Sequence, residues 1–131
     1  MLSNAVIALS LMFSICYLSS CSKGAAVDKI IEKEVEAANK SCPVAMDSET
    51  RLDSVTHPAK STIGYYYTLI NLEKDSLTFG PEMLENNLVE AIIATPQVKI
   101  LRELDTIFKY VYFDKNGDVA FEINVTPEKY K

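Results

Sequence analysis

The sequence has few of the residues on which enzymes and metal sites usually depend. It contains one histidine, His57, and three cysteines. It has no glycine-rich phosphate loop, no nucleophile motif and no catalytic pair of carboxylates. A zinc site needs several cysteine or histidine ligands, and a catalytic cysteine needs a base beside it. The sequence therefore gives no positive support for catalysis, and we expect neither a metal nor a cofactor.

Charge is also missing from one end of the chain. Residues 1–22 carry no charged side chain, so the net charge of −5 belongs to the remainder. That remainder is acidic and has no cluster of lysine and arginine, which nucleic acids and anionic lipid surfaces require of a partner. We therefore expect no nucleic acid partner.

An uncharged apolar run over residues 5–18 ends at Leu18-Ser19-Ser20-Cys21. Its length is typical of a secretory signal peptide. The ending resembles the lipobox of bacterial lipoproteins, in which an aliphatic residue and two small residues precede the cysteine. The resemblance implies a signal peptide over residues 1–20 and a mature chain that begins at Cys21. Cys21 would carry a diacylglyceryl thioether and an N-acyl chain such as palmitate, and several acyl chains give stable membrane anchoring.

One feature departs from that pattern, because Met1-Leu-Ser-Asn4 contains no basic residue. Either the true start lies upstream of Met1, or the leader uses its α-amino charge alone. An uncleaved anchor and an ordinary cleaved signal remain the alternatives. Ser22 follows the cysteine, and the resemblance then favours the outer membrane, with the domain facing the periplasm.

Cysteine usage leaves a single thiol in the folded part. With Cys16 in the leader and Cys21 lipidated, only Cys42 remains, so the mature chain cannot form an intramolecular disulfide. The simplest interpretation is a structural cysteine that is wholly or partly buried. An intermolecular disulfide, or a thiol-dependent factor or small enzyme that uses Cys42, is the alternative. The only histidine, His57, is expected on a surface loop over residues 57–61.

Periodicity predicts a tether over residues 21–26 and a single α+β domain over residues 27–131. Apolar residues at helical spacing indicate one helix from Val27 to Ala38 and a second that opens at Pro81 and stops at Thr95-Pro96. Alternating or β-branched segments indicate strands at Arg51–Thr56, Ile63–Ile70, Val98–Arg102, Thr106–Phe113 and Val119–Thr126. The order α-β-β-α-β-β-β predicts an antiparallel sheet of four to five strands with both helices packed on one face.

The last two strands are joined by Asp114-Lys-Asn-Gly-Asp118. Asn116 and Gly117 favour the positive φ values that a tight hairpin turn needs. The segment also resembles the start of a calcium-binding loop, but its glycine is misplaced and its flanks are strands rather than helices. We expect a hairpin turn.

Tyr65-Tyr66-Tyr67 puts two rings on one face of its strand and one ring on the other. Together with Tyr110 and Tyr112, they offer an aromatic platform for a peptide or a sugar. The alternative is that these rings pack beneath the helices. Tyr66 is the member expected to be exposed, and it is our candidate for a binding surface.

Three segments of the mature chain carry a resemblance: Asn39-Lys-Ser-Cys-Pro43, residues 47–55 and residues 65–69. They are similar to a group of small secreted or lipid-anchored Gram-negative proteins. The resemblance implies an envelope location and a shared fold, and it implies no activity. We expect a non-enzymatic envelope protein that is held to a membrane by lipid and binds another protein, a peptide or a cell-wall component.

The anchor is testable by changing one atom. Cys21→Ala removes the sulfur that accepts the diacylglyceryl group, so we expect no incorporation of a labelled fatty acid and an accumulation of unprocessed precursor in mass spectra. Cys42→Ser serves as the matched loss of a thiol and should be labelled normally. Continued labelling of the Cys21→Ala chain would refute the anchor.

Overall fold

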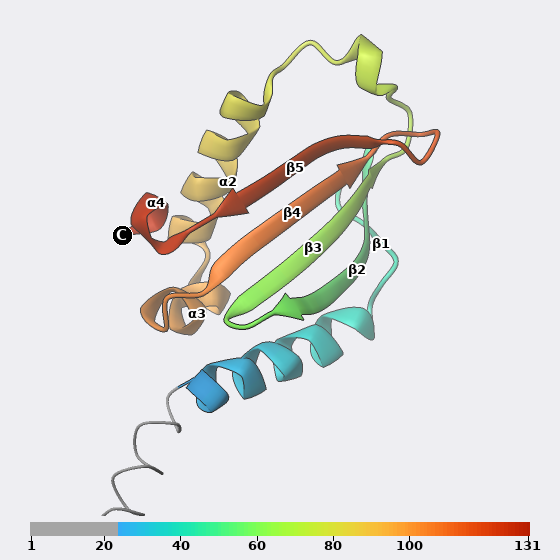
Figure 1. Cartoon of the computed structure of the whole chain (residues 1–131). Coiled ribbons are helices and arrows are strands. Elements are labelled where there is room, and N and C mark those ends of the chain that lie inside the picture. The colour runs from blue at the N-terminus through green and yellow to red at the C-terminus, as the bar shows by residue number, and fades with distance from the viewer. Residues whose placement is uncertain (1–23) are drawn as a thin grey trace, which may run out of the picture.

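A five-stranded sheet with helices on one face is the framework of this chain (Figure 1). The computed structural model describes residues 24–131, so the signal peptide and Cys21 lie outside the described residues. The α+β class, the sheet of four to five strands and its cover of helices on one face are confirmed. The strands are β1 (Val44–Ala45), β2 (Thr50–Ala59), β3 (Thr62–Leu69), β4 (Ile107–Phe113) and β5 (Val119–Val125).

The strands lie side by side in sequence order, and all neighbours are antiparallel except β3 and β4. These two central strands run parallel, with Tyr65 opposite Tyr110 and Tyr67 opposite Tyr112. A parallel pair needs a long crossover rather than a hairpin. Residues 70–106 provide it, and α2 (Pro81–Ala94) lies within this crossover.

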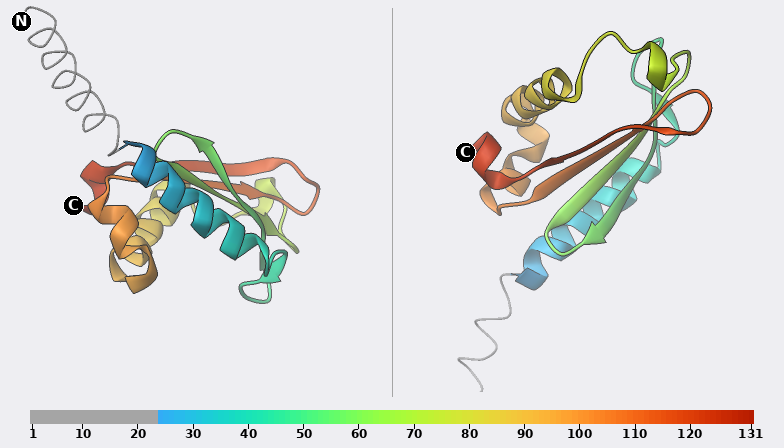
Figure 2. Two further views of the ribbon diagram at one scale, coloured as in Figure 1. Left: turned by 90° about the horizontal axis from the view of Figure 1, so that it is seen from below. Right: turned by 45° about the horizontal axis from the view of Figure 1, so that its top comes forward.

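Two long helices cover the same face of the sheet (Figure 2, left). The N-terminal helix (residues 24–39) lies over β2 and already includes residues 24–26. Its last residue, Asn39, exchanges two hydrogen bonds with the backbone of Val55 at 2.8 and 2.9 Å. The second helix, α2, lies toward β5, beside the short C-terminal helix α4 (Pro127–Tyr130). No helix within residues 24–131 combines the length and the apolar character needed to cross a bilayer.

The core lies between the helices and the face of the sheet that they cover. Register places alternate residues of β3, β4 and β5 on this face, and Phe108 at its centre is fully buried. Ile31 of the N-terminal helix, Leu101 and Val125 are also buried there. The opposite face has no helix over it in the described chain, which explains the alternation of exposed and buried residues along β5.

The strand expected at Val98–Arg102 is wrong. Pro96–Val98 form a 3-10 turn and α3 (Lys99–Glu103) follows it directly. Leu101 is buried whereas Ile100 is exposed, which suits a single helical turn laid on the core. Proline at the first helical position, followed by lysine, leucine and arginine, favours the helix.

The hairpin turn expected after β4 is confirmed, although Gly117 has positive φ and Asn116 does not. Asp114 organises this turn. This buried carboxylate accepts the backbone N–H groups of Asn116 at 2.9 Å and Asp118 at 3.0 Å, and that of Lys74 at 3.2 Å. Burial alone would raise the pKa of Asp114, but these three donors hold it below the ordinary value. The carboxylate therefore stays ionised and joins the turn to the segment that follows β3.

Gly117 has φ of +87° in this turn, with no atom near the position of an added Cβ. Gly117→Val should therefore lower stability through backbone strain rather than crowding, by about 1–2 kcal/mol. Gly117→Asn is the matched variant, because asparagine tolerates positive φ best among residues with a side chain. Thermal unfolding by circular dichroism measures both. Equal melting temperatures for the Gly117→Val variant and the wild-type chain would contradict this role of the turn.

Candidate functional site

An open groove runs between α2 and the loop that connects β1 to β2. It consists of two adjoining cavities of about 260 and 320 Å³, which share Met46 and Tyr67. Met46 stands at the rim with 56% of its surface exposed. Most other lining residues are apolar or aromatic, and they come from segments that are far apart in the sequence: Leu69, Phe79, Leu84, Leu88, Ile92, Val98 and Phe121.

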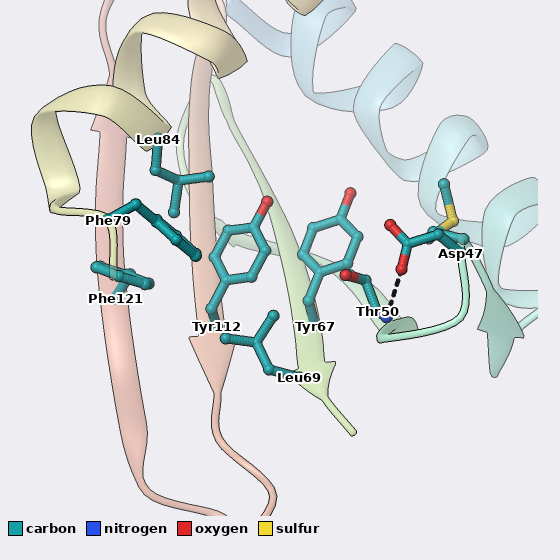
Figure 3. Close-up of a pocket in the computed structure, with 9 residues that line it drawn as sticks. Asp47, Thr50, Tyr67, Leu69, Phe79, Leu84, Tyr112 and Phe121 are labelled. Atoms are coloured by element: carbon teal, nitrogen blue, oxygen red, sulfur yellow. Dashed lines mark hydrogen bonds between the residues drawn. The ribbon is translucent and has the colours of Figure 1, made fainter. Parts of the chain in front are cut away.

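Four tyrosines form the floor of this groove. Their rings stack in the order Tyr65, Tyr110, Tyr67 and Tyr112, with centroid separations of 5.2, 6.5 and 4.9 Å. Parallel pairing of β3 with β4 places each ring opposite its neighbour on the other strand. Figure 3 shows the hydroxyls of Tyr67 and Tyr112 pointing away from the sheet, into the space between α2 and the N-terminal helix.

The phenol groups of the floor are held in their neutral form. Burial is the main cause that raises the pKa of Tyr65, Tyr110 and Tyr112 far above 10, and it raises that of Tyr67 to about 12. Within residues 24–131, none of the hydrogen bonds uses these four hydroxyls, whereas Tyr130 donates to the carbonyl of Thr106 at 2.7 Å. The floor therefore offers a row of free hydroxyl groups above an aromatic surface.

One wall of the groove is α2, which presents Leu84, Leu88 and Ala91. Sequence patterning predicts these three residues and Ile92 as a buried stripe. Ile92 is buried, the two leucines are half-buried and Ala91 is exposed. The end of α2 is fixed by Arg102, whose guanidinium donates to the carbonyls of Ile92 and Thr95. Unpaired carbonyls at a helix C-terminus favour such a cation.

The other wall is the tight loop between β1 and β2, and Asp47 holds its shape. One carboxylate oxygen of Asp47, Oδ1, accepts the backbone N–H groups of both Glu49 and Thr50 at 2.8 Å. The Glu49 N–H is the main cause that lowers the pKa of Asp47. Asp47 is the one charged side chain among the described residues that line the groove.

Tyr66, the candidate from the sequence, lies on the opposite face of the sheet. Its ring stacks on Phe113 at 6.5 Å and folds back over Gly64, where an added Cβ would lie 3.3 Å from the ring. Tyr66 is half-buried in this packing. The platform expected from five tyrosines thus contains four of them, and a binding role for Tyr66 stays a prediction.

Cys42 is a free and partly buried thiol that packs against the core. It precedes β1, whose Val44 pairs with Leu52, whereas His57 lies five residues further along β2. At about 3.3 Å per residue, that separation is roughly 16 Å. The structure therefore does not bring the histidine to the thiol.

The sequence predicts His57 on a surface loop, and this prediction is wrong. It belongs to β2 and is mostly covered, with Nε2 3.1 Å from Asp28 Oδ1 on the N-terminal helix. The same Asp28 oxygen accepts the N–H of Ser61 at 2.8 Å. This contact attaches the start of the N-terminal helix to the β2–β3 turn, and it is remote from the groove.

A protein-family model, the domain of unknown function DUF8479, matches residues 25–121, which is most of the chain. The chain belongs to this family. The match includes the N-terminal helix, all of α2 and the four floor tyrosines, so the groove falls within the DUF8479 domain. A search among curated proteins found no match.

Solved structures share the fold at very low sequence identity. A Pseudomonas aeruginosa protein assigned as secreted has a TM-score of 0.72 and 12% identity, over 83% of this chain and 96% of its own. EpsS, the pilotin of the Vibrio vulnificus type II secretion system, has a TM-score of 0.70 and 11% identity, over 84% and 96%. The Vibrio cholerae type II secretion pilotin AspS has a TM-score of 0.67 and 12% identity, over 85% and 98%. At such identities, the likeness shows a common fold.

Alkaline pH should reveal the buried phenols. Above pH 10 the unfolded chain releases phenolic protons that the folded state retains, so the unfolded state binds fewer protons and stability falls as pH rises. Each floor tyrosine should contribute up to about 1.4 kcal/mol per pH unit. Tyr110→Phe should make the decline shallower in denaturant unfolding between pH 9 and 11.5. An unchanged slope would contradict the retention of the Tyr110 proton.

Proposed function

We propose that this chain is an accessory lipoprotein of a Gram-negative cell envelope that binds a segment of a partner protein in the tyrosine groove. The observation that carries the proposal is the groove itself, an open and largely apolar hollow between α2 and the β1–β2 loop. Tyr65 and Tyr67 of its floor are partly accessible, whereas Tyr110 and Tyr112 are buried. An exposed apolar surface of this kind is costly in water and commonly marks a site of interaction. No cysteine, histidine or pair of carboxylates lies among the described residues that line it.

A helical segment suits the groove better than an extended one. The floor presents side chains, because the backbone groups of β3 and β4 are already paired with neighbouring strands. An extended peptide would therefore find no strand edge to pair with, and its own backbone groups would stay unpaired over an apolar surface. An amphipathic helix satisfies its backbone internally and can lay its apolar side on the tyrosines.

The solved relatives of the fold support an envelope role. Two of them are pilotins of type II secretion systems and another is assigned as secreted. The proposal extends that setting to this chain and makes its partner a component of an envelope assembly, not a small-molecule substrate.

Anchoring completes the proposal. Lipid on Cys21 would hold the domain at the periplasmic side of the outer membrane, and the described helix begins only three residues after that cysteine. Three residues span at most about 11 Å, so the start of the N-terminal helix would lie close to the membrane surface.

A thiol-dependent mechanism receives no support from the site. Cys42 is partly buried, and His57, the only histidine in the chain, is held by Asp28 instead. We therefore propose a non-enzymatic binding function rather than a thiol-dependent one.

Two alanines of α2 permit a matched test in cells. Ala91 and Ala94 are both exposed, but only Ala91 lines the groove. A photo-crosslinking amino acid at position 91 of the full chain should form a discrete adduct with one envelope protein, and at position 94 it should not. Ala91→Trp should abolish co-purification of that protein, because the indole fills the groove.

The test compares the crosslinked adducts formed from position 91 with those formed from position 94. Identical adducts from both positions, or unchanged co-purification with the Ala91→Trp variant, would exclude the groove as the binding site.

A further inference from the structure

A fixed negative charge lies in the wall of an otherwise uncharged groove. Asp47 engages the N–H groups of Glu49 and Thr50 through Oδ1 alone. The side chain of Thr50 also helps to lower the pKa of Asp47, but no hydrogen bond or ion pair of residues 24–131 ends on the other oxygen, Oδ2. The two bonds to Oδ1 hold the carboxylate in place, so Oδ2 is a preorganised acceptor at the rim.

This charge is close to the aromatic floor. Figure 3 draws the Asp47 carboxylate beside the ring of Tyr67. The negative charge of Asp47 also contributes, after burial, to the raised pKa of the Tyr112 phenol. A cation bound at Oδ2 would therefore lie beside electron-rich rings, where a cation gains further attraction.

The α2 residues that line the opposite wall are uncharged, and the one cation at the end of this wall, Arg102, is engaged by the carbonyls of Ile92 and Thr95. The α2 residues that line the groove are Leu84, Leu88, Ala91 and Ile92, and Thr95 follows at the helix end. A second carboxylate, Glu34 of the N-terminal helix, is near enough to contribute to the raised pKa of the Tyr65 phenol. The two carboxylates near the floor thus lie on the side of the N-terminal helix and the β1–β2 loop.

An occupant that covers the groove removes water from the Asp47 carboxylate. A carboxylate without a partner is expensive to desolvate, and its two backbone donors keep it from becoming neutral at physiological pH. An occupant with an apolar side and no cation would bear this cost, and one with an acidic residue there would be repelled.

We infer that the segment bound in the groove is a basic amphipathic helix, in which a lysine or arginine beside the apolar face pairs with Oδ2 of Asp47 above Tyr67 and Tyr112. The inference rests on the proposed function, because it specifies the occupant of the same groove. It makes the contact directional, since the basic edge of the helix must face the β1–β2 loop and its uncharged edge must face α2.

Three synthetic 15-residue helical peptides test the inference. They share one leucine face and differ only in the residues along one edge of that face, which are lysine, glutamine or glutamate. The full chain is held in nanodiscs of zwitterionic phospholipid, and binding is followed by fluorescence anisotropy against empty nanodiscs. We expect the lysine peptide to bind about tenfold more tightly than the glutamine peptide and the glutamate peptide to bind most weakly.

Asp47→Asn isolates the charge, because the amide oxygen can still accept the N–H groups of Glu49 and Thr50. It should reduce the affinity for the lysine peptide to that for the glutamine peptide. Glu49→Gln removes the same charge from the same loop outside the groove lining and should leave the preference in place. Circular dichroism verifies that both variants are folded.

The outcomes separate the two proposals. Equal binding of the lysine and glutamine peptides, or equal effects of Asp47→Asn and Glu49→Gln, would overturn the basic partner and leave groove binding intact. If none of the peptides binds, or if Ala91→Trp does not reduce their binding, the groove is not a docking site and both proposals are wrong.

Discussion

Parallel pairing of β3 with β4 is the constraint on which the rest of this molecule depends. It places Tyr65 beside Tyr110 and Tyr67 beside Tyr112, so four rings stack across the middle of the sheet. It also requires a long crossover between the two strands, and this crossover contains α2. One pairing thus supplies both the floor of the groove and one of its walls.

The tyrosine floor combines two properties that rarely coincide in a core. The stacked rings are apolar enough to hold the sheet together beneath the helices, and the hydroxyl of each ring remains free within the described chain. If leucine stood at these positions, the floor would have no hydrogen-bonding groups. The polar tips make an open groove above the tyrosines tolerable in water.

Three aspartates of the described chain use their carboxylates to accept backbone N–H groups. Asp28 joins the N-terminal helix to the β2–β3 turn, and Asp114 organises the β4–β5 turn. Asp47 shapes its own loop with one oxygen and leaves the other in the wall. The same device, a carboxylate that accepts backbone N–H groups, therefore serves structure in two places and recognition, as we propose, in the third.

Local signals in the sequence were sufficient to predict the elements whose ends carry a proline or a glycine. Proline opens and follows α2, and Gly117 marks the hairpin, because proline fixes φ and glycine permits positive φ whatever surrounds them. The helical turn at Lys99–Glu103 was missed because its short apolar segment fits a strand equally well. The groove could not be predicted, because it joins residues of the β1–β2 loop, α2 and two central strands that only the parallel pairing brings together. The sequence alone determined the residue types and the approximate ends of the elements, and tertiary structure decided which tyrosines meet, because strand order and direction depend on long-range pairing rather than on local preference.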